Sequence, residues 1–514
     1  MPLTHVKPEN DEPDPDAERI VMDTRSRADA QSVKAHEERT GDKASGNNSR
    51  LHNSPKALTD APLNDEVPGP LLSHPGASLV RSLVAVLVGS LVLRLASQTT
   101  GQMLQFYFDE IDRNYYHLSY TTTGFVTASF FIAELFGALV LGAMSDRYGR
   151  KPFIILGPLL GAMAVQITSM TVVVWLLVLT RLLEGLSTAS SVPATLGYIS
   201  ETTVGRPNLR ARIIGLYEIT LVGGIAMGAV AGGYLWKWFG EPATFAGVRF
   251  ISPAFGINGL IYLASLAIFV WGLKDIKRET PASDEGANGK LRHYREVLKS
   301  PAVWMFIPAW VAIFSIIGMW TNHSPRLMTG QQGYGNQMLT GITPERFGNG
   351  FAILAIIFAV GVLSWSFILG RYRRTSIMLI ATAGLLVTLA SVYGLNHIES
   401  LSSPLYYPLL ASLLVGIFVL SGFTPAALTY LADVTESYAK DRGSIMGLYS
   451  VFLGVGQLLG TATGGYFADW NGTDGLLLLS AFFGAITIVS LLALRNRNLR
   501  NPSRPSLQSP EPHR

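Results

Sequence analysis

Four charged residues lie inside long apolar stretches of the sequence, where a charge is costly to bury and normally pairs with an opposite charge or serves a function. The first is Arg94, which has a leucine on each side, and the second is Glu134. Arg94 is suited to hold an anionic solute, and Glu134 is suited to carry a proton. A permanent ion pair between the two is the structural alternative, and the sequence leaves both interpretations open.

The other two charges, Arg181 and Glu184, are three residues apart. On a helix this spacing places both side chains on one face, so that they can form an ion pair. Arg181 is also a candidate for proton coupling or gating, and Glu184 is a candidate for binding the substrate or a proton. Two uncharged polar residues in apolar stretches, Gln102 and Asn258, are weaker candidates for contact with a ligand, because such residues ordinarily pack between helices.

Several other kinds of chemistry find no support in the sequence. The chain has no cysteine, which excludes disulfides, thiolate catalysis and zinc sites built on cysteine. No P-loop, dinucleotide fingerprint or GxSxG elbow occurs in a workable context. We place His323 in a loop with no second metal ligand at a suitable spacing, so we expect no metal, no cofactor and no enzymatic activity. The net charge of +4 is spread over short clusters, which argues against a nucleic-acid partner.

The elements that carry these residues are apolar stretches long enough to cross a lipid bilayer. Hydrophobic residues make up 48% of the 514 residues and charged residues only 15%, whereas about a quarter of a soluble domain is charged. A crossing needs about 20 mostly apolar residues in a helix, because lipid offers the backbone no hydrogen bonds. The sequence predicts twelve such helices, at 79–105, 120–143, 153–171, 173–199, 213–236, 250–273, 302–321, 346–369, 376–395, 405–431, 444–467 and 475–494.

Lysine and arginine are concentrated in alternate loops between these helices, and basic loops normally face the cytoplasm. The pattern predicts that both termini lie in the cytoplasm. We expect an integral protein of the plasma membrane. The predicted parts are a disordered cytoplasmic tail at 1–77, a six-helix bundle at 78–273, a cytoplasmic linker at 274–300, a second six-helix bundle at 301–494 and a basic cytoplasmic tail at 495–514.

A repeat relates the two predicted bundles when the sequence is shifted against itself by about 232 positions. Proline, arginine, tyrosine and tryptophan coincide as well as glycine, and chance alignment of apolar sequence does not explain those matches. Because six crossings separate the copies, each copy enters the membrane from the same side and the halves are parallel. Matching pairs include Pro193 with Pro425, Tyr198 with Tyr430, Arg210 with Arg442, Gly232 with Gly464 and Trp238 with Trp470.

The stretch GAMSDRYGRK lies between the second and third predicted helices. Asp146 ends a helix there, and it can accept charge-assisted hydrogen bonds from Arg150 or from backbone N–H groups at the start of a neighbouring helix. A degenerate second copy, Gly370–Arg374, has glycine in place of the aspartate. The stretch resembles the signature GxxxDRxGRR of the major facilitator superfamily through Gly142, Asp146, Arg147, Gly149 and Arg150.

Two further stretches bear on this resemblance. Arg181 and Gly185, followed by Pro193, resemble the second signature of the superfamily. Gly228–Gly233 resembles the GPxxGG element of its antiporters, but Ala229 stands in the position of the proline. That departure weakens the case for exchange or drug efflux.

The resemblance covers roughly residues 78–494 and implies alternating access, in which two bundles rock about a central site. It also implies that Asp146 latches the cytoplasmic side by reaching the eleventh helix near Ser444. We expect a monomeric, proton-coupled transporter of a small organic molecule, with efflux slightly favoured. Its partners are then the lipid bilayer, the solute and protons. The alternatives are an uptake symporter for an organic anion or a sugar-like metabolite, and a non-transporting receptor or scaffold of the same fold.

Overall fold

The computed structural model describes residues 77–245, 247–274, 301–330, 336–400, 402–434 and 442–500. All of them belong to one compact unit, Ser73–Arg514. The predicted tails and linker fall almost wholly outside these ranges, on residues 1–76, 275–300 and 501–514. Their predicted roles therefore stay predictions.

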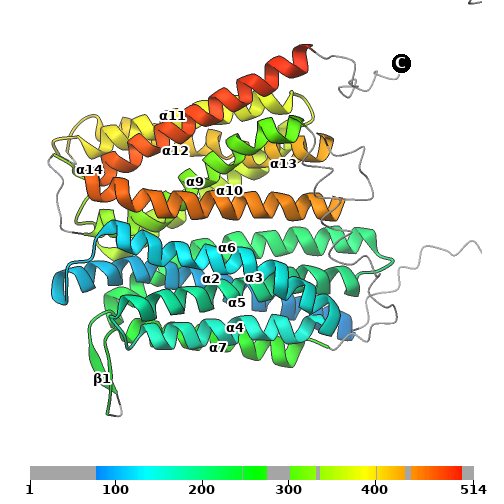
Figure 1. The fold of residues 1–514 in the computed structure, drawn as a ribbon, viewed down its shortest axis with the longest axis vertical. Helices are drawn as coiled ribbons and strands as arrows, with labels where there is room; N and C mark the ends of the chain where they lie inside the picture. Colours follow the sequence, from blue (N-terminus) through cyan, green and yellow to red (C-terminus); the bar gives the residue numbers. More distant parts are fainter. Residues whose placement is uncertain are drawn as a thin grey trace, which may run out of the picture. The chain divides into compact units, whose positions relative to one another are not determined.

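The first half of the unit consists of helices drawn from blue to green in Figure 1. The shortest of them has 19 residues, close to the length that crosses the apolar part of a bilayer. The start of α3 is capped, since the Ser119 hydroxyl accepts a hydrogen bond from the backbone N–H of Thr122 (3.1 Å). The helices are α2 (Ala77–Asn114), α3 (Tyr120–Tyr148), α4 (Arg150–Thr168), α5 (Val174–Thr202), α6 (Pro207–Phe239) and α7 (Pro253–Gly272).

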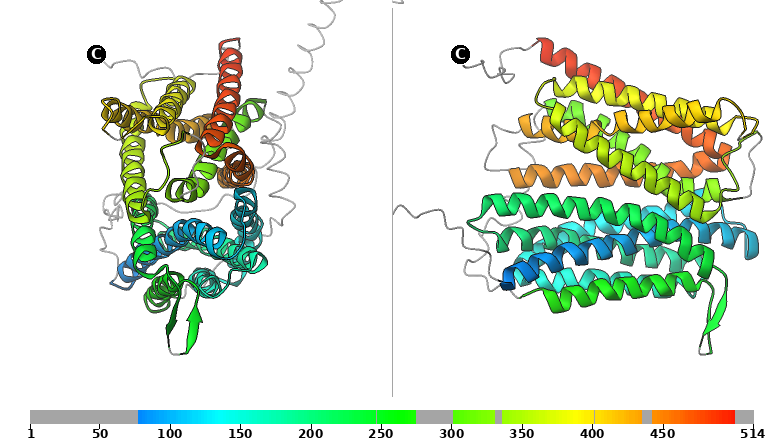
Figure 2. Two further views of the ribbon diagram at one scale, coloured as in Figure 1. Left: turned by 90° about the vertical axis from the view of Figure 1, so that its left-hand side faces the viewer. Right: turned by 180° about the vertical axis from the view of Figure 1, so that it is seen from behind.

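The second half repeats this arrangement with less regular crossings (Figure 2). The tenth crossing is broken into two helices at Ser421 and Gly422. The last helix has non-helical backbone at Asn471 and Gly472, so it supplies two crossings. The helices are α9 (Pro301–Thr329), α10 (Pro344–Ile368), α11 (Arg374–Asn396), α12 (Tyr406–Leu420), α13 (Phe423–Val434) and α14 (Arg442–Arg500).

Ten helical spans among the described residues are long and apolar enough to cross a membrane. The last of them, Val451–Arg497, has 47 residues and contains the kink. α5 has 29 residues but is not among the ten, and it carries Arg181 and Glu184. The fold class is confirmed, and the spans are consistent with twelve crossings. The unpredicted addition is a two-stranded antiparallel hairpin between α6 and α7, formed by β1 (Ala243–Phe245) and β2 (Val248–Phe250).

Within each half, glycines bring one pair of helices into close contact, and the two pairs are equivalent in the repeat. A Cβ atom at Gly224 of α6 would lie 3.0 Å from the Leu91 carbonyl oxygen of α2. A Cβ atom at the repeat-related Gly456 of α14 would lie 2.7 Å from the Val311 carbonyl oxygen of α9. The sequence repeat is thus also a packing repeat, in which α14 lies on α9 as α6 lies on α2. The same rows continue with Gly228 and Gly232 on α6 and with Gly460 and Gly464 on α14.

Several helices extend further than the sequence predicts, and α2 and α9 do so at the end of the molecule that holds Asp469. α2 continues to Asn114 instead of 105, and α9 continues to Thr329 instead of 321. The loop placement of His323 is therefore wrong, because this residue lies in α9 and is 1% exposed. The predicted stretches end at polar residues, because the prediction counts only apolar ones. The His323 ring is nevertheless buried, since it packs closely against Gly124 of α3 and Gly464 of α14.

We name the two ends of the helical unit after one residue at each. The Asp146 end holds the α3–α4, α5–α6 and α10–α11 connections. The Asp469 end holds the α2–α3, α4–α5, α9–α10 and α11–α12 connections and the β-hairpin, which projects at one side in Figure 1. Asp469 itself lies in α14 just before the kink.

Candidate functional site

Arg94 and Glu134 are the charged residues closest to the middle of their helices, α2 and α3. The Nε atom of Arg94 is buried and has no hydrogen-bond partner in the described part of the chain. No carboxylate of the described residues lies within 4.0 Å of its guanidinium group. Glu134 and Glu218 are near enough for a coulombic attraction to Arg94 without contact. The permanent contact pair of Arg94 and Glu134 is therefore not formed here.

Gln102 and Asn258 are both buried, at 1% and 0% exposure. The Asn258 amide nitrogen donates to the Ala96 carbonyl (3.0 Å) and to the Thr100 hydroxyl (2.8 Å), so it joins α7 to α2. Gln102 differs, because neither its amide nitrogen nor its amide oxygen has a partner among the described residues. A buried polar group without a partner costs about 1–3 kcal/mol, which makes Gln102 the stronger candidate for ligand contact.

Arg181 and Glu184 are both buried in α5 and form an ion pair with each other. The Arg181 guanidinium also lies 5.9 Å from the ring centroid of Phe130 in α3. The two helices approach closely at Gly185, where a Cβ atom would clash with the Phe130 carbonyl oxygen. The structure contains the ion pair that the spacing predicts, whereas a role of Arg181 in proton coupling stays a prediction.

At the Asp146 end, Arg150 joins the ends of three helices. It forms an ion pair with Asp146 at the end of α3, and its Nε atom lies 3.0 Å from Oε1 of Glu201 near the end of α5. It also donates a hydrogen bond to the Ser145 hydroxyl (2.8 Å). The predicted contact between Asp146 and the eleventh helix near Ser444 lies outside the described side chains.

The remaining residues of this motif shape the turn. Gly149 has a φ of 101°, which residues with a side chain rarely adopt, and it lets the chain reverse between α3 and α4. A Cβ atom at Gly142 would lie 3.7 Å from Pro193 of α5, an ordinary packing distance. The exposed Arg147 lies 5.6 Å from the ring centroid of Tyr148.

The arginine–carboxylate contact recurs in the second half. Arg374, the counterpart of Arg150, has its Nε atom 3.3 Å from Oδ2 of Asp433. The repeat alignment places Asp433 opposite Glu201, so the signal for this shared contact is present in the sequence. Because Gly370 stands where the first copy has Asp146, only the first half carries the additional aspartate.

A buried arginine at the Asp469 end was missed by the sequence prediction, which placed it in a loop. Arg326 of α9 is 1% exposed, and its guanidinium lies 3.2 Å from Oδ2 of Asp112 in α2. It donates a hydrogen bond to the Leu118 carbonyl (2.6 Å) and lies 4.2 Å from the ring centroid of Tyr120. Because α2 and α9 belong to different halves, these contacts join the halves at this end.

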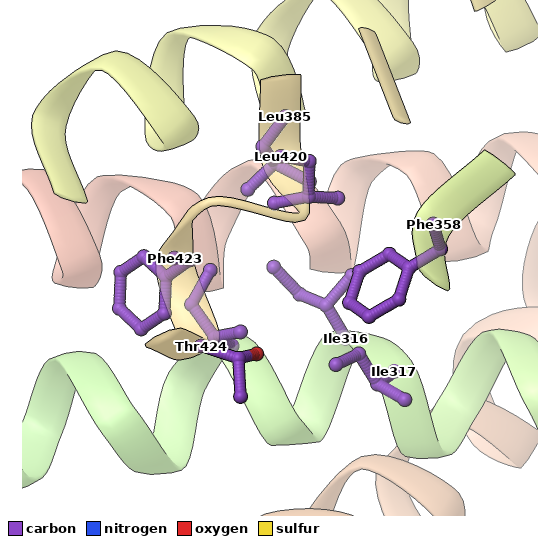
Figure 3. A pocket seen from close by; sticks show the side chains of 8 residues that line it. Ile316, Ile317, Phe358, Leu385, Leu420, Phe423 and Thr424 are labelled. Atoms are coloured by element: carbon purple, nitrogen blue, oxygen red, sulfur yellow. The ribbon is translucent and has the colours of Figure 1, made fainter. Parts of the chain in front are cut away.

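A small apolar pocket lies in the second half, beside the break between α12 and α13 (Figure 3). Its cavity volume is about 20 Å³, which is room for about one water molecule. Its walls come from five helices, and its lining includes Ile316, Phe358, Leu385 and Phe423, with Thr424 as the polar residue. Pockets that bind organic solutes measure about 300–1,000 Å³, so this pocket would have to widen before it could receive one.

Two repeated helical halves in a membrane, with buried charges near its middle, define a polytopic membrane transporter. The sequence matches the Major Facilitator Superfamily over residues 86–410 and 340–513. The chain belongs to this family.

Curated relatives include transporters named for drug resistance. The chain is 23% identical over 372 residues to Multidrug resistance protein 2 of Bacillus subtilis (strain 168), covering 69% of this chain and 82% of the relative. It is 38% identical over 113 residues to the class C tetracycline resistance protein of Escherichia coli, covering 22% of this chain and 28% of the relative.

Solved structures share the fold. The nucleoside transporter NupG aligns with a TM-score of 0.60 at 14% identity, covering 80% of this chain and 98% of that chain. A bacterial homolog of the human lysosomal transporter Spinster, in an inward-facing and unoccupied conformation, aligns with a TM-score of 0.62 at 15% identity, covering 82% of this chain and 98% of that chain.

Proposed function

We propose that this transporter exports a small organic solute by alternating access, driven by protons that move in the opposite direction. The observation that carries the proposal is Arg94, a charge near mid-membrane with no carboxylate in contact among the described residues. Such a charge is costly to keep unless it takes part in function. The names of the drug-resistance relatives support export, whereas Ala229 in the antiporter-like element counts against it.

The expected solute combines an apolar body with a negatively charged or polar group. The apolar lining of the pocket beside Phe423 is the proposed contact for the body, once that pocket widens. Arg94 and the unpartnered Gln102 of the first half suit the polar group. Glu134 is the proposed proton carrier, because its protonation would change how strongly Arg94 is held and therefore how well Arg94 binds an anionic group.

The test is flux in proteoliposomes under an imposed proton gradient. Solutes are chosen first by thermal stabilisation of the detergent-purified protein, because a ligand that binds the folded state raises its melting temperature. Glu134→Gln should abolish proton-driven flux while solute exchange at equal pH persists. Glu110→Gln, at the end of α2, is the matched control and should keep the coupling. Undiminished coupling in Glu134→Gln would remove Glu134 from the mechanism.

The same assay separates the alternatives. Accumulation of an organic anion driven by an inward proton gradient would favour the uptake symporter, for which an Arg94 without a contact carboxylate is equally suited. Absence of any flux, together with tolerance of changes at Asp146, would favour a receptor or scaffold. We propose the plasma membrane as the location, a monomer as the working unit, and the cytoplasm as the compartment that the Asp146 end faces.

A further inference from the structure

Asp469 of α14 holds the start of α3, which belongs to the other half. Its two carboxylate oxygens accept hydrogen bonds from the backbone N–H groups of Tyr120 (2.6 Å) and Thr121 (2.7 Å). The Thr121 hydroxyl donates a third hydrogen bond (2.5 Å). A carboxylate at a helix N-terminus meets both unpaired N–H donors and the positive end of the helix dipole. The contact is therefore charge-assisted and joins the halves at the Asp469 end.

A glycine brings the two helices together one turn before Asp469. A Cβ atom at Gly465 would clash with the Tyr120 carbonyl oxygen and lie 2.9 Å from the Thr121 Cα atom. A Cβ atom at Gly124 of α3 would lie 2.9 Å from the Thr461 carbonyl oxygen of α14. The backbones of α3 and α14 thus touch directly, so the carboxylate can reach the helix start.

The repeat predicts an equivalent contact between α6 and α10, at the same end of the helical unit. Gly233 and Lys237 of α6 correspond to Gly465 and Asp469 of α14. A Cβ atom at Gly233 would lie 2.5 Å from the Pro344 carbonyl oxygen at the start of α10. The Lys237 ammonium lies 3.0 Å from Oε1 of Glu345. In each half, a glycine and a charged residue near the end of one helix therefore contact the first turn of a helix in the opposite half. The pairs are α14 with α3 and α6 with α10.

The difference in charge between the two contacts has a physical reason. An aspartate can cap a helix N-terminus directly, but a lysine would be repelled by the positive end of the dipole. α10 accordingly carries an acidic residue, Glu345, in its first turn, and this residue accepts the Lys237 ammonium. α3 has no acidic residue in its first turn, so Asp469 supplies the negative charge from the opposite half.

We propose that Asp469 is a latch that holds the Asp469 end of the transporter closed, with Lys237 and Glu345 as its repeat-related counterpart. This inference rests on the proposed alternating-access function, because a latch matters only if that end opens. Asp146 and Asp469 lie at opposite ends of the paired helices α3 and α14. Asp469 would then stabilise the state closed at its own end, and Asp146 the state closed at the other end. The Arg326–Asp112 contact also joins the halves at this end, so loss of Asp469 should loosen the closure rather than abolish it.

The experiment measures opening without relying on transport. The chain has no natural cysteine, so Thr123→Cys introduces a single thiol at a position that is 0% exposed and lies where α3 meets α9 of the opposite half. Its labelling rate by a water-soluble maleimide is measured in nanodiscs, where both membrane faces are accessible. Adding Asp469→Asn should raise this rate about tenfold, which corresponds to about 1.4 kcal/mol, because the amide has no charge and only one acceptor oxygen. Asp469→Ala should raise it further.

The matched control is Asp474→Asn at the same end. Asp474 contacts Asn396 and His397, which belong to the same half as Asp474 itself, so labelling should not change. A second arm uses Lys237→Glu, which should also raise labelling, and Lys237→Glu with Glu345→Lys, which should restore it. Equal labelling of Asp469→Asn and the parent would overturn the latch. A labelling change in a protein that moves no solute would uphold the latch and refute the transport proposal.

Discussion

At the scale of residues, the buried and partly buried arginines differ in whether a carboxylate lies in contact. Arg150, Arg181 and Arg326 each contact at least one carboxylate, whereas Arg94 contacts none among the described residues. Removing one partner of a buried pair leaves the other charge uncompensated, which typically costs about 3–5 kcal/mol. Structural and working charges should therefore respond differently to substitution.

Replacing Arg181 by methionine should destabilise the protein by about 3–5 kcal/mol, because Glu184 would stay buried without its partner. A second substitution, Glu184→Leu, should recover most of this loss. The free energy of unfolding of the detergent-solubilised protein, followed by denaturant titration, measures both effects. A double variant as unstable as the single one would show that the pair is not the cause.

Asp146→Asn should leave the protein folded and inserted but slow transport severely, by about tenfold or more. The substitution weakens the contact with Arg150 and removes the charge proposed to latch the Asp146 end. The initial rate of solute flux in proteoliposomes measures the effect. Arg81→Gln is the control, because Arg81 is exposed at the same end and donates its hydrogen bond to the Trp271 carbonyl of its own half. Wild-type flux in Asp146→Asn would refute the latch at this end.

At the scale of elements, glycine positions decide how closely helices approach. Some glycines have no room for a methyl group, and others face open space. Contact between helices in a membrane depends on this fit, because lipid removes the hydrophobic driving force that acts in water.

Gly185→Ala should destabilise the protein by about 1–3 kcal/mol, since the new methyl group would force α5 away from the Phe130 carbonyl oxygen of α3. Gly215→Ala in α6 has nothing within 4 Å of the new methyl group and should be neutral or stabilise by about 0.5–1 kcal/mol. Melting temperatures of the two variants in the same detergent provide the comparison. Equal destabilisation of both would show that close approach is not the reason.

At the scale of the whole molecule, contacts between the halves are recorded at the Asp469 end, through Asp469, Arg326 and Lys237. Alternating access requires these contacts to break in each cycle. A covalent link across the halves should therefore stop transport, whereas a link within one half should not.

Thiol-specific cross-linking of a Lys237→Cys, Glu345→Cys variant should abolish flux, and cleavage of a reducible linker should restore it. The control is an Asn396→Cys, Asp474→Cys variant, whose positions lie at the same end but within one half. Its flux should survive cross-linking. Transport that continues with the first link intact would contradict rocking of the halves.

The sequence by itself determined the number of apolar stretches, the internal repeat and the motif at Asp146. These features are local or periodic, and they depend on the chemistry of neighbouring residues alone. The ion pair of Arg181 and Glu184 was predictable for the same reason, because the two residues are three positions apart on one helix.

Only the tertiary structure decided which distant side chains meet. The burial of His323 and Arg326, the lack of a contact carboxylate for Arg94 among the described residues and the capping of α3 by Asp469 all depend on how different helices pack. Asp469 and Tyr120 are 349 positions apart, and the repeat aligns Asp469 with a lysine. Composition and spacing carry no information on such a contact, because it depends on how two helices from opposite halves are packed against each other.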